Sequence, residues 1–142
     1  MNDALLLDTH IALWLDAGDQ RLAPSTRALI DSIWQRGGRI GLSAVSVWEI
    51  ALLVDSTRVA LDLTVAEWVT RFLARPGLEA VPLEYGAAAL AYRLADLEHR
   101  DPADRLLIAT AVACEFALVT YDERILRFAE RSGSRYGFIA CR

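Results

Sequence analysis

The sequence has no lysine and few of the residues that most often build metal or redox sites. All 15 basic residues are arginine, and the 142 residues include only two cysteines and two histidines. Cys114 and Cys141 lack the spacing of zinc ligands, and Cys114 lies in an apolar segment that we expect to be core. This composition argues against a zinc site and a disulfide framework, and it favours a reduced, cytoplasmic setting.

Long apolar runs and glycine-rich phosphate loops are also missing. No apolar stretch reaches the ~20 residues that a membrane span needs, so we expect no membrane partner. The acidic N-terminus, Met1-Asn2-Asp3, is not typical of a secretory signal. Without a phosphate loop, nucleotide-binding folds of the P-loop or dinucleotide type are disfavoured. Ser43 and Ser46 have no histidine in a relation typical of a serine hydrolase.

Short apolar runs alternate with amphipathic segments along the whole chain. The runs predict strands over residues 4–8, 39–43, 78–83, 116–120 and 136–140. The amphipathic segments predict helices over residues 10–17, 24–36, 46–54, 64–75, 85–97, 102–115 and 122–131. This alternation indicates an α/β fold, a three-layer α/β/α sandwich with a central, mostly parallel sheet. The length suits a single domain over residues 1–142.

Four acidic residues, Asp8, Glu49, Asp104 and Asp122, lie where predicted strands end and helices begin. Each has a purely structural explanation. Asp8 and Asp122 suit helix N-caps, and Ser46 with Glu49 has the pattern of a capping box. The stretch Asp101-Pro102-Ala103-Asp104 supplies an N-cap, a first-turn proline and an acid that the helix dipole favours.

We expect the four acids to lie close together, because the carboxyl ends of parallel strands share one edge of the sheet. Two unit charges ~4 Å apart repel by about 4 kcal/mol at an effective dielectric of 20, so gathered carboxylates need protons or a cation. Oxygen ligands without histidine or cysteine suit Mg²⁺ or Mn²⁺, which also take phosphate oxygens. The pattern therefore predicts metal-assisted hydrolysis of a phosphodiester by a metal-activated water.

The net charge of −4, from 19 acidic and 15 basic residues, argues against a nucleic-acid partner only while these four acids are counted. Without them, acidic and basic residues balance. An RNA substrate is then acceptable, although the lack of a basic excess predicts modest intrinsic affinity.

Four stretches of the chain resemble the PIN-domain family, and within it the VapC-type toxins of bacterial toxin–antitoxin pairs. They are LLLDTHIALW (5–14), LSAVSVWEIALL (42–53), HRDPADRLLIATA (99–111) and LVTYDERI (118–125). The resemblance implies a metal-dependent endoribonuclease whose catalytic and metal-binding acids are Asp8, Glu49, Asp104 and Asp122. It also implies a homodimer that a cognate VapB-type antitoxin protein holds inactive.

Residues beside the four acids carry secondary expectations. Two threonines, Thr9 and Thr120, are candidates to hydrogen-bond a site carboxylate or a metal-bound water. We interpret Asp101 as a helix cap that is also a candidate to support the site acids. Arg100 and Arg105 either bind RNA phosphate or neutralise a nearby carboxylate. We expect His10 and His99 to serve packing or hydrogen bonding, and most of the four tryptophans to lie in the core.

Two other functions fit parts of the pattern. A metal-dependent phosphatase of small substrates usually has two aspartates two residues apart after its first strand, whereas Asp8 is followed by Thr9 and His10. A non-catalytic PIN-like binding module would tolerate loss of one or more acids, whereas this chain has all four.

Overall fold

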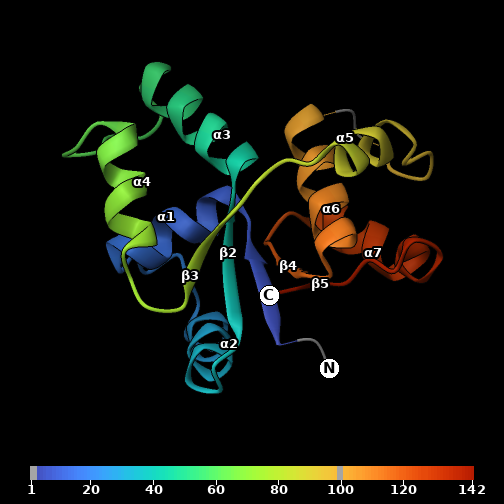
Figure 1. Ribbon diagram of the computed structural model, residues 1–142, viewed down its shortest axis with the longest axis horizontal. Coiled ribbons are helices and arrows are strands. Elements are labelled where there is room, and N and C mark those ends of the chain that lie inside the picture. Colours follow the sequence, from blue (N-terminus) through green and yellow to red (C-terminus); the bar gives the residue numbers. More distant parts are fainter. Residues whose placement is uncertain (1–2, 99–100) are drawn as a thin grey trace.

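The computed structural model describes residues 3–98 and 101–142 and contains a five-stranded sheet between two layers of helices (Figure 1). The strands are β1 (Ala4–Leu7), β2 (Arg39–Ser43), β3 (Leu78–Val81), β4 (Ala117–Val119) and β5 (Ala140–Cys141). The helices are α1 (Thr9–Ala17), α2 (Pro24–Gln35), α3 (Ala44–Asp55), α4 (Val65–Leu73), α5 (Tyr85–Tyr92), α6 (Pro102–Cys114) and α7 (Glu123–Tyr136). The predicted α/β/α architecture is confirmed.

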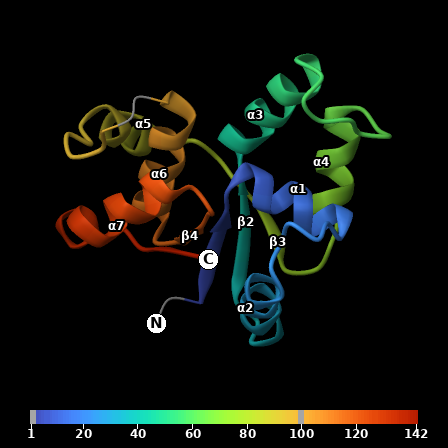
Figure 2. The ribbon, with the colours of Figure 1, turned by 180° about the vertical axis from the view of Figure 1, so that it is seen from behind.

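All strand pairs in the sheet are parallel, in the order β3-β2-β1-β4-β5. The chain first builds outward from β1 to β2 and β3, and then returns to add β4 and β5 on the other side of β1. The connections α1 to α4 therefore cover one face, and α5 to α7 cover the other (Figures 1 and 2). The strand β1 is the topological switch point, where α/β sheets bind ligands at the carboxyl ends of their strands.

Alternation along the strands divides the apolar residues between two cores. Leu5 and Leu7 of β1 pack with Ile11, Ile50 and Phe72 on the α1–α4 face. All five are almost fully inaccessible to solvent, and Trp68 joins them from α4. Because side chains of a strand alternate between faces, Leu6 points to the opposite core.

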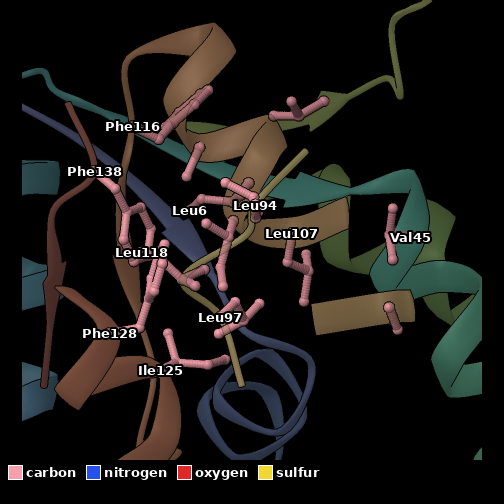
Figure 3. Close-up of a cluster of buried hydrophobic side chains, with 14 of the residues drawn as sticks. Leu6, Val45, Leu94, Leu97, Leu107, Phe116, Leu118, Ile125, Phe128 and Phe138 are labelled. Carbon is pink, nitrogen blue, oxygen red and sulfur yellow. The ribbon is translucent and has the colours of Figure 1, made fainter. Parts of the chain in front are cut away.

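The second core lies between the sheet and α5 to α7 (Figure 3). Leu6 and Leu118 of the central strands meet Leu107 of α6 and Phe128 of α7 there. Gly41 of β2 faces this core, and a β-carbon at that position would lie 2.6 Å from Val81 Cγ2, closer than real β-carbons come. The two cores fix β1 and β4 side by side, with Leu6 opposite Leu118.

Most predicted elements are present, but two boundaries are wrong. The helix predicted over residues 85–97 ends at Tyr92, and a turn follows in which Leu94 and Leu97 are nonetheless buried. The strand predicted over residues 136–140 is also wrong, since α7 continues to Tyr136 and ends at Gly137 in the left-handed conformation (φ 69°). Only Ala140–Cys141 pairs with β4.

None of the helices in residues 3–98 and 101–142 has the length and apolar character that crossing a membrane requires.

Candidate active site

The carboxyl edge of the sheet holds a cavity of about 840 Å³ whose wall includes five acidic residues. In Figure 1 this edge lies toward α3, which β2 enters directly. The acids come from four different helix starts, and they are Asp8, Glu49, Asp101, Asp104 and Asp122. The structure thus brings together the four acids singled out from the sequence, along with Asp101.

Three of these acids also cap helices, so the structural and chemical explanations are compatible. Asp8, Asp101 and Asp122 are the N-caps of α1, α6 and α7, and each accepts a hydrogen bond from a backbone N–H of its helix. These bonds satisfy N–H groups that have no partner inside the helix. The caps point carboxylates into the cavity because parallel strands deliver every following helix start to the same edge.

The predicted capping box of Ser46 with Glu49 is wrong. The N-cap of α3 is Ser43, whose hydroxyl accepts from the N–H of Val45 at 3.0 Å, so the cap lies three residues before the expected one and the helix begins at Ala44. Ser46 therefore lies inside the helix, completely buried. The shift also places Glu49 in the second turn, with its carboxyl group in the cavity wall.

Thr9 joins Ser46 to Glu49 beneath the cavity. The Thr9 hydroxyl hydrogen-bonds to Glu49 Oε1 at 2.5 Å and to Ser46 Oγ at 3.0 Å. Both hydroxyl groups are buried, so their bonds hold Glu49 in one orientation. Ser46 was considered from the sequence only as a cap or a nucleophile, and its contact with Thr9 depends on how α1 packs against α3.

Thr120 plays the same part for Asp8. Its hydroxyl donates to Asp8 Oδ2 at 2.6 Å and accepts from the N–H of Asp122 at 3.0 Å. Asp8 Oδ1 accepts from the N–H of Thr9 at 2.8 Å, so both oxygens of this carboxyl group are held. Thr120 thereby connects the acid that follows β1 with the acid that follows β4.

The surroundings make ionisation of three of the acids costly. Burial, followed by the charges of Asp101, Asp8, Asp122 and Glu49, raises the pKa of Asp104 from 3.8 to about 7. Burial also raises the pKa of Asp8, against the opposing hydrogen bonds from Thr120 and Thr9. The pKa of Glu49 is raised by burial first, and then by Asp8 and Asp101. Without a cation, this cavity concentrates more negative charge than it stabilises.

The donor atoms of the cavity match a hard divalent cation. The cavity wall offers carboxylate oxygens, one histidine and no cysteine. Carboxylate oxygens are the protein ligands that Mg²⁺ and Mn²⁺ prefer. Among the described residues, no three acidic, histidine or cysteine side chains already stand in an arrangement that could hold an ion. The carboxyl groups of Asp8 and Glu49 form hydrogen bonds to hydroxyl and backbone groups, which hold them in the cavity wall.

Comparison with known proteins assigns the chain to a family. Residues 5–131 match the PIN domain. The chain belongs to the PIN-domain family. It is 32% identical, over 121 residues, to Ribonuclease VapC22 of Mycobacterium tuberculosis (strain ATCC 25618 / H37Rv), covering 85% of this chain and 88% of that relative. The recognition made from the four sequence stretches is confirmed.

Solved structures show the same PIN fold at low sequence identity. VapBC2 from Rickettsia felis, bound to a DNA fragment from its promoter, matches with a TM-score of 0.64 and 17% identity, covering 96% of each chain. FitAcB from Neisseria gonorrhoeae matches with a TM-score of 0.59 and 19% identity, covering 97% of this chain and 96% of the other. These likenesses concern the fold alone.

Arg105 of this PIN domain has a structural role that was not considered from the sequence, and its role in RNA binding stays a prediction. Its guanidinium group donates to the backbone carbonyls of Ala91, Leu94 and Leu97, at 3.1 to 3.2 Å. It thus holds the turn that replaces the predicted last part of α5. The other RNA-binding candidate, Arg100, lies outside the described residues, as does His99.

The expectation that most tryptophans lie in the core is wrong for two of the four. Trp68 is 2% exposed, but Trp34 is 46% and Trp48 60% exposed. Trp48 lines the acidic cavity of the PIN domain, together with His10, Trp14 and Tyr121. The His10 ring lies 5.7 Å from that of Trp14, in the packing role expected for it.

Proposed function

We propose that this PIN domain is a metal-dependent endoribonuclease and the toxin component of a type II toxin–antitoxin system. Its four-carboxylate site would hydrolyse RNA phosphodiesters with a metal-activated water. The observation that carries the proposal is the cavity at the switch point of the sheet, which Asp8, Glu49, Asp104 and Asp122 line. Ionisation of the first three of these acids is costly there. The relative named Ribonuclease VapC22 supports the RNA-directed activity.

The cost of ionisation favours a cation over a purely structural role. Helix caps need one carboxylate at each helix start, and they do not need those carboxylates to converge. Burial, together with the charges of the converging carboxylates, raises the pKa of Asp104 to about 7, and a domain shaped by stability alone gains nothing from this shift. A bound divalent cation would reverse the sign of the local charge and favour the ionised carboxylates.

The residues that would hold Mg²⁺ or Mn²⁺ are the same four acids. When bound, the cation supplies a Lewis acid that neutralises phosphate charge and activates water for attack on phosphorus. Thr120 fixes Asp8 and Thr9 fixes Glu49, so these carboxylates are oriented before substrate arrives. Asp104 must give up its proton to act as a ligand, and its raised pKa makes that step depend on pH near neutrality.

The proposal includes two protein partners. A solved toxin–antitoxin complex from Klebsiella pneumoniae has the same fold, with a TM-score of 0.57 and 16% identity, and we propose a cognate VapB-type antitoxin for this chain. We also propose a homodimer, because large apolar side chains such as Tyr85 and Tyr92 remain 95% and 90% exposed. Light scattering during size-exclusion chromatography would give twice the mass of one chain. The mass of a single chain at micromolar concentration would contradict the dimer.

Cleavage of a mixed cellular RNA pool by antitoxin-free protein tests the activity. We expect discrete products with Mg²⁺ or Mn²⁺, none with EDTA, and none from Asp104→Asn. The matched control is Asp62→Asn, which makes the same charge change at an exposed position outside the cavity and should cut like the wild-type chain. Cleavage that persists in EDTA or in Asp104→Asn would contradict the four-carboxylate site, and an inert wild-type chain would favour a binding module or a phosphatase.

A further inference from the structure

The wall of the acidic cavity has an aromatic side chain that the carboxylate chemistry does not use. Trp48 precedes Glu49 on α3, lines the same cavity and is 60% exposed. Among the described residues, no aromatic ring or arginine is recorded against the Trp48 indole, whereas Trp14 contacts both His10 and Tyr121. An exposed tryptophan in the wall of a charged cavity is typical of a binding site.

The cavity also contains cations beside its acids. Arg58, just after α3, lines it with an exposed side chain and forms no ion pair within the described part of the chain. Arg124, on the first turn of α7, lies 3.5 Å from Asp122 and remains largely exposed. The wall therefore combines an exposed aromatic ring with two guanidinium groups and the site carboxylates. Aromatic faces and arginines in one groove are typical of sites for single-stranded nucleic acid.

We propose that Trp48 stacks an unpaired base of the RNA substrate, and that Arg58 binds a phosphate of the same strand. The proposal rests on the ribonuclease function, and it adds the residues of the cavity wall that would hold the substrate strand. A base inside a duplex is covered on both faces by its neighbours, so it cannot lie against a side chain.

The helix geometry explains why Trp48 is placed to do this. Trp48 and Leu52 are one turn apart on α3 and share its exposed face, while Ile50 packs into the core. Glu49 and Trp48 line the same cavity, so a base against the indole lies in the cavity that holds the site carboxylates. The stacked base would hold the substrate strand in this cavity and so add to its binding free energy.

Kinetics on a mixed-sequence, unpaired 20-nucleotide RNA test the proposal. Base–aromatic stacking is worth roughly 1–3 kcal/mol for each base, so Trp48→Ala should raise KM about 5-fold or more. The value of kcat should change little, because the contact serves binding rather than the reacting atoms. Trp48→Phe should restore most of the loss. The matched control is Trp34→Ala, which removes a 46% exposed indole outside the cavity and should leave KM unchanged.

A binding measurement separates this proposal from the ribonuclease function. Fluorescence anisotropy would follow a labelled single-stranded RNA on Asp104→Asn protein with Mg²⁺, with and without Trp48→Ala, and with the same sequence as a duplex. We expect Trp48→Ala to weaken single-strand binding and to have little effect on the duplex. Thermal melting would verify that each variant is folded.

Each combination of results has one meaning. Cleavage with a wild-type KM in Trp48→Ala would overturn the stacking site and leave the ribonuclease intact, indicating that the ring serves a protein interface. Binding that depends on Trp48 without cleavage by the wild-type chain would support the stacking site and overturn the ribonuclease. Failure of the Asp104→Asn protein to bind the single strand would overturn the stacking site as well.

Discussion

Asp104 is an acid placed where its negative charge is costly. It is 8% exposed, and four other carboxyl groups act on it. Its folded pKa of about 7 exceeds the unfolded value of 3.8, so the folded protein holds the proton more tightly. Stability is then highest at low pH with respect to this group, and it falls as pH rises from about 4 toward 7.

Asp104→Asn should therefore stabilise the metal-free protein at neutral pH. We expect its Tm in EDTA to exceed the wild-type Tm by several degrees at pH 8, since about 1 kcal/mol shifts Tm by roughly 2–4 °C in a domain of this size. The advantage should shrink as pH falls toward 5, where Asp104 is protonated in the folded chain. Asp62→Asn should show no such trend, and a Tm difference that is constant from pH 5 to 8 would contradict the assignment.

Thr9 is a buried hydroxyl that supports a site acid. Thr9→Val keeps the shape of the side chain but leaves Ser46 and Glu49 without their shared partner. We expect the free energy of unfolding to fall by about 1–3 kcal/mol, the cost of a buried polar group left unsatisfied. Urea denaturation would measure it. Thr70→Val, on the exposed side of α4, should change stability by less than about 0.5 kcal/mol, and equal losses in the two variants would contradict the buried network.

The helix α5 shows how an element can depend on a distant side chain. Nothing in the local sequence ends this helix at Tyr92, because Ala91, Leu94 and Leu97 continue its apolar spacing. The end is set by Arg105 of α6, which binds carbonyls both in the last turn of α5 and in the turn beyond it. A charged donor satisfies the carbonyls of Ala91 and Leu97 and adds a second hydrogen bond to that of Leu94, which also accepts from the N–H of Leu97.

Arg105→Met should loosen this region without touching the cavity. We expect a loss of roughly 1.5–3 kcal/mol, as for hydrogen bonds to a charged group, with faster amide hydrogen exchange in residues 85–97. RNA cleavage at 25 °C should remain if the variant is folded. Arg93→Met removes an exposed arginine nearby and should behave like the wild-type chain. A large loss of cleavage by folded Arg105→Met would restore Arg105 as an RNA-binding candidate.

Across the whole molecule, the sheet converts four separate helix starts into one cavity. The acids come from positions 8, 49, 104 and 122, and only the parallel order with β1 as the switch point brings them together. Their charges then act on one another, so a cation that binds all of them favours the folded state. The free energy gained follows the ratio of ion concentration to Kd.

Millimolar Mg²⁺ or Mn²⁺ should therefore raise the Tm of the wild-type chain. At an ion concentration of 100 Kd the gain is about 2.7 kcal/mol. Differential scanning fluorimetry with and without EDTA would measure the shift. Asp8→Asn should reduce it, and Asp62→Asn should not. Identical melting curves with and without the ions would contradict the proposed metal site.

The alternation of apolar strands and amphipathic helices was enough to predict the layered α/β/α fold. A sheet that is buried on both faces needs apolar strands, and the helices that cover it need one apolar face each, so both patterns are visible in the sequence. The PIN-family recognition and the caps Asp8, Asp101 and Asp122 likewise followed from local patterns. Their roles in catalysis stay predictions. What the sequence could not determine were features that depend on packing between distant segments.

Those features are the end of α5 at Tyr92, where Arg105 of α6 binds it, the cap of α3 at Ser43, and the exposure of Trp48. A local pattern fixes which face of a helix is apolar. It does not fix which distant side chain reaches that helix, or which side of it a neighbour leaves uncovered. The tertiary structure decides these features because they depend on how far each helical layer extends over the sheet. The order of the strands sets that extent.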